Sequence, residues 1–313
     1  MATAVDLAHD PLARIVVATD FSPTASQVLD RAIDLARRHE SEIALVHVVQ
    51  PDLPTLASPE MMVVPPDYES RLSDLSSEAL QREAERVRAA GIAVSTHLEH
   101  GIPAQRITER ANALGADLIA IGARGHTRFE HLLLGSVVES VVRTAQQPVL
   151  TIHPEDRRPV EPVGTLLFPT DLTDEAESAL FSAIHLLARS PESRILLVHA
   201  FHLAASVVPF TGFGDAMPPY FVENARELAE AAARPVVERL RRRGFQVEAI
   251  IERGDPSEVV LALAAERSVD VIAIATHTRS PLRRFLLGST TLRVVEYAPC
   301  PVLTVHAPSP GPH

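Results

Sequence analysis

The 313-residue chain has little of several features that would point to particular classes of protein. Its single cysteine, Cys300, excludes an internal disulfide and a zinc site built from thiolates alone. It has no run of about 18 apolar residues that could span a membrane as a helix, and its first residues show neither the basic nor the apolar segment of a secretory signal. Acidic residues outnumber basic ones by 40 to 29, and a net charge of −11 argues against nucleic acid or an anionic membrane as a partner. We therefore expect a cytoplasmic protein.

What is present is a long internal repeat. Three pairs of segments recur at a separation of roughly 150 residues, too long for a solenoid and typical of tandem domains. They are Thr19-Asp20 with Thr170-Asp171, Leu133-Leu134-Gly135-Ser136 with Leu286-Leu287-Gly288-Ser289, and Pro148-Val149-Leu150 with Pro301-Val302-Leu303. With 46% hydrophobic and 22% charged residues, both copies have the composition of globular domains. We predict domains at 1–154 and 164–313, joined by a proline-rich linker at 155–163.

Strands and helices alternate within each copy. Residues 14–19 form a continuous apolar run rich in β-branched residues, which is typical of a strand covered on both faces. Ser22-Pro23 then predicts a helix start, and a long helix is expected from about residue 68 to residue 90. Further strands are expected at 42–49, 92–99, 117–121 and 148–152, and in the second copy at 165–169, 194–200, 246–252, 270–275 and 301–305. This order predicts an α/β fold, in which a mainly parallel sheet carries helices on both faces.

The residues that follow the strands are the ones to read for chemistry, because ligands of such sheets bind beyond the carboxyl ends of the strands. After the fourth strand comes Gly122-Ala123-Arg124-Gly125, then nine residues, then Gly135-Ser136 at the start of a helix. Glycines let the backbone approach a ligand closely, and a helix N-terminus attracts an anion. On spacing alone, however, an ordinary turn and helix cap explain these glycines equally well.

This Gly-x-x-Gly-(nine)-Gly-Ser pattern resembles the ATP-binding signature of the universal stress protein family. Thr19-Asp20, Val46-His47-Val48 and Gly101-Ile102-Pro103 also resemble that family's pattern. The resemblance implies two tandem flavodoxin-like (Rossmann-like) domains, each a five-stranded sheet of order 3-2-1-4-5. It also implies which residues of the first copy bind ATP. Asp20 and the backbone of Val48 would contact the adenine, and Gly122 would lie beside the ribose. The phosphates would be held by Gly125, Gly135, Ser136 and Val137. An alternative role for Asp20 is to cap the helix that begins near Ser22.

The second copy departs from the signature. Ala275 and Thr278 stand where the first copy has Gly122 and Gly125. Its weaker candidate residues are Asp171, Ala200, Ala275, Thr278, Gly288, Ser289 and Thr290. We expect this copy to bind nucleotide weakly, to bind something else, or to be structural.

Sequence motifs of catalysis are missing. The chain has no Gly-x-x-x-x-Gly-Lys-Ser/Thr loop and no Gly-x-Ser-x-Gly nucleophile turn. No catalytic residue is assigned, and we expect at most slow, incidental ATP hydrolysis. His47, His97 and His100 are interpreted as surface or core residues rather than metal ligands.

Two classes of function remain open. The first is an ATP-binding stress-response regulator, with Mg²⁺ on the phosphates, whose nucleotide occupancy changes its conformation or its binding of a regulatory protein. The alternative is a non-nucleotide scaffold, or a carrier of small molecules or lipids, in which the second copy is structural. The family resemblance also implies that strands 149–152 and 302–305 pair as edges, giving a pseudo-dimer within one chain. A further homodimer would use the loops 51–66 and 202–218.

Overall fold

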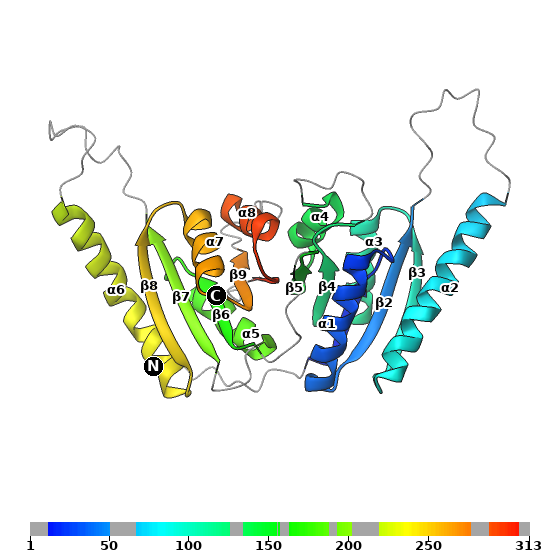
Figure 1. The fold of residues 1–313 in the computed structure, drawn as a ribbon, viewed down its shortest axis with the longest axis horizontal. Coiled ribbons are helices and arrows are strands. Elements are labelled where there is room, and N and C mark those ends of the chain that lie inside the picture. The colour runs from blue at the N-terminus through cyan, green and yellow to red at the C-terminus, as the bar shows by residue number, and fades with distance from the viewer. Residues whose placement is uncertain are drawn as a thin grey trace, which may run out of the picture. The chain divides into compact units, whose positions relative to one another are not determined.

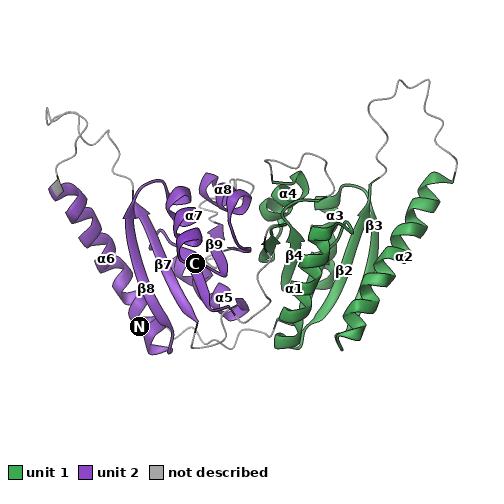
Figure 2. Ribbon diagram, viewed as in Figure 1, with its two compact units in different colours: residues 1–154 green, residues 155–313 purple. Residues whose placement is uncertain are grey.

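The computed structural model describes residues 12–50, 67–125, 134–154, 156, 163–187, 193–201, 219–276 and 288–306. The chain divides into two compact units, Met1–Pro154 and Glu155–His313, which Figure 2 draws in separate colours. Of the expected linker 155–163, only Asp156 and Val163 are among the described residues, and the loops 51–66 and 202–218 lie outside them.

The described part of unit 1 alternates strands and helices (Figure 1). The elements are β1 (Arg14–Ala18), α1 (Pro23–His39), β2 (Glu42–Val49), α2 (Tyr68–Ala89), β3 (Val94–His100), α3 (Pro103–Leu114), β4 (Leu118–Gly122), α4 (Ser136–Thr144) and β5 (Val149–Ile152). The strands lie in the order β3-β2-β1-β4-β5, and each neighbouring pair is parallel. This confirms the flavodoxin-like order 3-2-1-4-5.

Unit 2 repeats this fold. Its elements are β6 (Thr165–Pro169), α5 (Asp174–Leu187), β7 (Arg194–Phe201), α6 (Pro219–Arg242), β8 (Gln246–Arg253), α7 (Pro256–Glu266), β9 (Val271–Thr276), α8 (Ser289–Tyr297) and β10 (Val302–His306). The strand order is β8-β7-β6-β9-β10, again with parallel neighbours. The same sequence pattern has therefore produced the same sheet twice.

The first helix shows how the sequence sets an element's bounds. The Ser22 side chain accepts a hydrogen bond from the Ala25 N–H, and Pro23 occupies the first helical position, where its missing N–H costs nothing. Val28 and Leu29 are completely buried against the sheet. The helix ends at His39, and its C-cap Glu40 adopts a left-handed conformation with φ of 57°.

Chain connections place the helices and thereby open the site. Right-handed crossovers from β1 to β2 to β3 put α1 and α2 on one face, and the return through β4 and β5 puts α3 and α4 on the other. Arg86 of α2 pairs with Asp30 of α1, which ties the first two helices together. Because the connections diverge on either side of β1 and β4, a crevice is expected at the carboxyl ends of these strands.

Across the described ranges, every helix is too short or too polar to span a bilayer.

Candidate functional site

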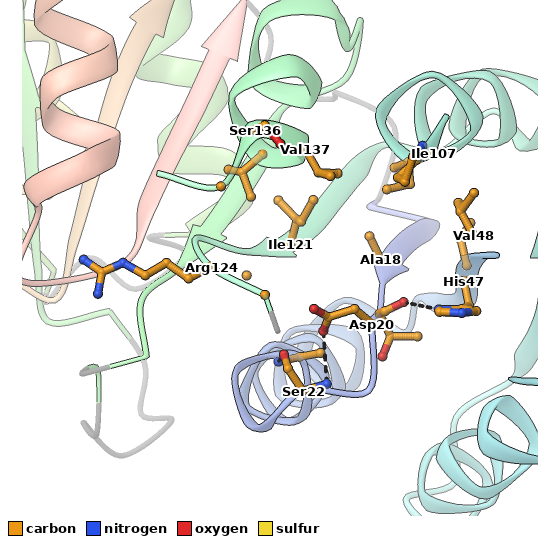
Figure 3. Close-up of a pocket in the computed structure, with 18 of the residues that line it drawn as sticks. Ala18, Asp20, Ser22, His47, Val48, Ile107, Ile121, Arg124, Ser136 and Val137 are labelled. Carbon is orange, nitrogen blue, oxygen red and sulfur yellow. Dashed lines mark hydrogen bonds between the residues drawn. The ribbon is translucent and has the colours of Figure 1, made fainter. Parts of the chain in front are cut away.

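A pocket of about 410 Å³ opens in unit 1 at the carboxyl ends of β1, β2 and β4 (Figure 3). Helices α3 and α4 also line the pocket, with Ile107 and Val138 among their residues. The structure brings to this one pocket all the residues that the resemblance assigned to the first copy: Asp20, Val48, Gly122, Gly125, Gly135, Ser136 and Val137. A volume in this range suits a small-molecule ligand.

Asp20 sits in a tight turn between β1 and α1. One of its carboxylate oxygens, Oδ1, accepts a hydrogen bond from the Ser22 N–H at 3.0 Å. The next residue, Phe21, has a φ of 63°, which is unusual for a bulky side chain and means that the surrounding contacts hold the turn in place. The helix cap itself is Ser22, so Asp20 braces the turn before the helix rather than capping it.

Hydrogen bonds of Thr19 and His47 stabilise this turn. The Thr19 hydroxyl accepts the Phe21 N–H at 3.1 Å, and the Nδ1 of His47 donates to the Thr19 carbonyl at 2.8 Å. The His47 ring also lies 4.4 Å from the Phe21 ring between centroids. Burial lowers the pKa of His47 below its ordinary value, outweighing the Thr19 carbonyl and the Asp20 charge, which raise it. The imidazole is therefore neutral at neutral pH and serves as a donor to the turn.

Space, rather than backbone conformation, explains the first two glycines of the signature. A Cβ added to Gly122 would lie 2.9 Å from the Cγ2 of Thr24, and one added to Gly125 would lie 2.4 Å from the Oδ2 of Asp20. Both distances are shorter than any ordinary contact of a Cβ atom. Neither glycine has a positive φ, so a left-handed backbone is not what these positions require.

The last part of the signature presents a helix N-terminus to the pocket. Gly135 is the N-cap of α4, no side chain caps the helix, and Ser136 and Val137 form its first turn at the pocket wall. The Gly135 N–H donates to the Ala123 carbonyl at 3.0 Å, which brings the two ends of the glycine loop together. The uncapped N–H groups and the positive end of the helix dipole favour an anion here.

Unit 2 keeps the turn but changes the glycines. The Thr170 hydroxyl accepts the Leu172 N–H, His199 donates to the Thr170 carbonyl, and Leu172 has a φ of 62°. The Oδ1 of Asp171 accepts from the N–H and the hydroxyl of Thr173. The other candidates described lie at the ends of β7 and β9 and at the start of α8: Ala200, Ala275, Gly288, Ser289 and Thr290. Thr278 lies outside the described residues.

Sequence reasoning missed a buried acid close to this site. Glu83 of α2 is only 9% exposed, and its Oε1 accepts a hydrogen bond from the Thr19 hydroxyl at 3.2 Å. Its signal was its place on the apolar stripe of α2, between Leu80 and Val87. Reasoning from motifs also missed the aliphatic wall that Ile107 of α3 provides.

The histidines do not form a metal cluster within the described residues. Within the described ranges, no three His, Cys, Asp or Glu side chains gather closely enough to hold a metal ion. The His97 ring contacts the hydroxyl of Ser95 on β3, and the His100 ring contacts the hydroxyl of Ser73 on α2.

Known proteins resemble both halves of the chain. A model of the Universal stress protein family matches residues 12–153 and again residues 163–306. A universal stress protein of Methanocaldococcus jannaschii is 32% identical over 143 residues, covering 44% of this chain and 81% of the relative. The universal stress protein YxiE of Bacillus subtilis is 27% identical over 145 residues, covering 45% and 98%. The crystal structure of a universal stress protein from Archaeoglobus fulgidus aligns with a TM-score of 0.70 and 23% identity over 94% of this chain and 96% of that one, a likeness in fold.

Proposed function

This chain belongs to the universal stress protein family, with two tandem copies of the domain, and from that premise we propose that the pocket of unit 1 binds ATP. The observation that carries the proposal is the pocket itself, which joins a carboxylate, an aliphatic wall and an uncapped helix N-terminus around one cavity. These are the three kinds of surface that an adenine, a ribose and a polyphosphate need.

The adenine would lie at the Asp20 end. The carboxylate of Asp20 is held by the Ser22 N–H and can accept a hydrogen bond from the exocyclic amine of the base. The backbone of Val48 borders the same end of the pocket, and the side chain of Ile107 offers an apolar surface to the flat faces of the ring. A neutral His47 below the turn adds no charge that would compete for Asp20.

The phosphates would lie at the N-terminus of α4. Gly125 and Gly135 leave room for the phosphate oxygens, and the Ser136 hydroxyl and the N–H of Val137 can donate to them. Mg²⁺ would bind at this end together with ATP. The hydroxyl oxygen of Ser136 could coordinate the ion, and phosphate oxygens and water would complete its coordination. Mg²⁺ would neutralise part of the phosphate charge.

Binding, rather than chemistry, is the proposed activity. Asp20 is the only acidic residue among the described residues that line the pocket, and we assign it to the adenine, so among these residues none is assigned to activate water. We propose that occupancy of unit 1 changes a surface that a regulatory protein reads in the stress response. A cytoplasmic location remains part of this proposal.

Unit 2 supports a second, structural role for that half. It retains Asp171 and the N-terminus of α8, but Ala275 places a methyl group where unit 1 has Gly122. We propose that unit 2 binds nucleotide more weakly than unit 1 and contributes to an internal pseudo-dimer. A scaffold without nucleotide is the competing function for the whole chain.

Mass analysis of small molecules released from the purified, denatured protein tests the proposal. Recovery of ATP or ADP at close to one molecule per chain would support it. The matched control is the Asp20→Ala variant, which should release much less nucleotide. If neither released nucleotide nor calorimetric binding of added ATP were found for the parent chain, the scaffold would be the better reading.

A further inference from the structure

Glu83 is a buried acid whose position folding alone does not explain. It lies on the face of α2 that packs against the sheet, alongside the fully buried Ala84 and Val87. Its Oε1 accepts from the Thr19 hydroxyl, while its Oε2 is buried and has no hydrogen-bond donor among the described residues. Leaving a buried carboxyl oxygen unpartnered is costly, so an acid at this position needs a reason.

Thr19, the partner of Glu83, is the residue on which the Asp20 turn is built. Its hydroxyl donates to Glu83 and accepts the Phe21 N–H, its carbonyl accepts from His47, and its own N–H donates to the Val46 carbonyl. Every polar group of Thr19 is therefore engaged. A shift of its hydroxyl would move the strained Phe21 and, with it, the carboxylate of Asp20.

Unit 2 supplies an internal comparison. Its turn has the same bonds to the Thr170 hydroxyl and carbonyl as the Thr19 turn, and the same left-handed residue. The buried positions of the two long helices correspond, Leu80, Ala84 and Val87 in α2 with Ala233, Val237 and Leu240 in α6. By this alignment the counterpart of Glu83 is Val236, which cannot bond to Thr170. The turn therefore forms without the acid, which unit 1 has in addition.

We propose that Glu83 is a positioning residue of the unit 1 nucleotide site, which holds the Thr19 hydroxyl, aims Asp20 at the adenine and links that turn to helix α2. This inference rests on the proposed function and deepens it, because it names the helix through which occupancy is communicated. The other end of the link is Arg86, three residues further along α2, which bonds to Ser26 and Asp30 of α1.

Protonation of Glu83 gives the link a pH dependence. Burial raises the pKa of Glu83 and the charge of Asp20 raises it further, whereas the Thr19 hydroxyl and the Arg86 charge lower it. The other titratable groups nearby are Asp30, which pairs with Arg86, and His47, whose lowered pKa leaves it neutral at neutral pH and which bonds to the Thr19 carbonyl. The Thr19 hydroxyl lowers the pKa because an ionised carboxylate accepts its hydrogen bond more strongly than the neutral acid does. Ionisation of Glu83 therefore tightens its hold on Thr19, while burial and the charge of Asp20 delay that ionisation to a higher pH.

ATP affinity measured by calorimetry between about pH 4 and pH 8 tests the inference in three chains, since this range brackets the ordinary pKa values of Glu and His. The parent should bind ATP more tightly as the pH rises through the raised pKa of Glu83, because the ionised carboxylate holds the Thr19 hydroxyl more strongly. Glu83→Gln retains a carbonyl for Thr19 without a charge, so its affinity should lack this gain. Glu83→Val copies the residue of unit 2 and should bind about tenfold more weakly than the parent at about pH 8, the loss expected for one hydrogen bond. Titration of the nucleotide and of His47 is common to all three chains and cancels in the comparison.

A matched control and an independent readout complete the design. Val236→Ala alters the corresponding position of α6 and should leave the affinity of unit 1 unchanged. Hydrogen exchange of the Phe21 amide, which bonds to Thr19, should speed up in Glu83→Val but not in Glu83→Gln. The inference is overturned if Glu83→Val binds ATP as the parent does, or if Glu83→Gln keeps the parent's pH profile. If the parent binds no ATP, the proposed function fails and the positioning role fails with it. If the Phe21 amide exchanges in Glu83→Val as it does in the parent, the link between the turn and α2 fails as well.

Discussion

Replacing Gly125 by alanine should weaken ATP binding through one steric clash, between the new Cβ and the carboxylate of Asp20. The added Cβ would lie 2.4 Å from the Oδ2 of Asp20, whereas ordinary contacts of a Cβ begin at 3.4 Å. The carboxylate must therefore retreat by about 1 Å or the loop must open, because a packed site relaxes only in part. Since the φ of Gly125 is not in the left-handed region, alanine brings no backbone strain of its own.

The magnitude follows from what Asp20 loses. Its retreat weakens one turn bond, to the Ser22 N–H, so the free energy of unfolding should fall by only about 1 kcal/mol. The bond from the adenine amine to a charged carboxylate is stronger, worth roughly 1.5–3 kcal/mol, and losing it lowers the affinity by about ten- to 100-fold. Affinity should therefore suffer far more than stability, which separates this collision from a general failure of folding.

A double-mutant cycle identifies the group that clashes. Asp20→Ala alone should weaken binding, and adding Gly125→Ala should cost little more, because both changes act through one carboxylate. Gly288→Ala is the control, since Gly288 lies in unit 2 and its added Cβ would come no closer than 3.9 Å to any non-neighbouring atom of the described residues. Calorimetric titration with ATP reads out the affinities. Parental affinity in Gly125→Ala, or full additivity in the double variant, would refute the assigned contact.

Further predictions concern the two units and their acids. Titration with ATP should give one tight site per chain, because unit 2 has Ala275 where unit 1 has Gly122. Two equal tight sites would contradict this. Because burial raises the folded-state pKa of Glu83, the folded parent binds this proton more tightly than the unfolded chain, and the associated stability is lost as the pH rises through that raised pKa. In denaturant unfolding, Glu83→Gln should lack this decline, and an unchanged pH profile would argue against a buried acid. Leu150→Asp combined with Leu303→Asp should separate or unfold the two units by placing charges on the predicted seam between edge strands; parental melting and scattering would rule out edge pairing.

The fold could be predicted closely from the sequence because its signals are local. The apolar run that ends at Ala18 and the Ser22-Pro23 start of α1 lie where the chain itself indicated them. The long helix was expected over 68–90 and spans Tyr68–Ala89. Periodicity indicated a parallel sheet but could not by itself order the strands, since pairing joins residues far apart in sequence. That order came from the resemblance to the family.

The site was only partly predictable, and for a physical reason. The glycine signature identified Gly122 and Gly125, and the explanation offered was close approach of the backbone to a ligand, whereas the structure shows that Thr24 and Asp20 of the protein itself leave no room for a side chain. Which atoms crowd a glycine depends on other strands and helices. Glu83 escaped notice for the same reason, because a glutamate on a helix is normally solvated and its burial depends on Thr19, far away in sequence.

Comparing the two units separates what the fold needs from what a ligand needs. The turn at Thr170 keeps its hydroxyl and carbonyl bonds and its left-handed Leu172 although unit 2 has lost the first glycine of the signature. These contacts thus belong to the architecture, and their presence says nothing about nucleotide. What unit 1 has in addition is Gly125, which leaves room for the Asp20 carboxylate, and the acid at Glu83, whose Oε2 is buried without a donor among the described residues. A costly buried acid and a glycine crowded by one carboxylate are best explained by the ligand proposed for Asp20, which is why substitutions at Gly125 and Glu83 test the function rather than the fold.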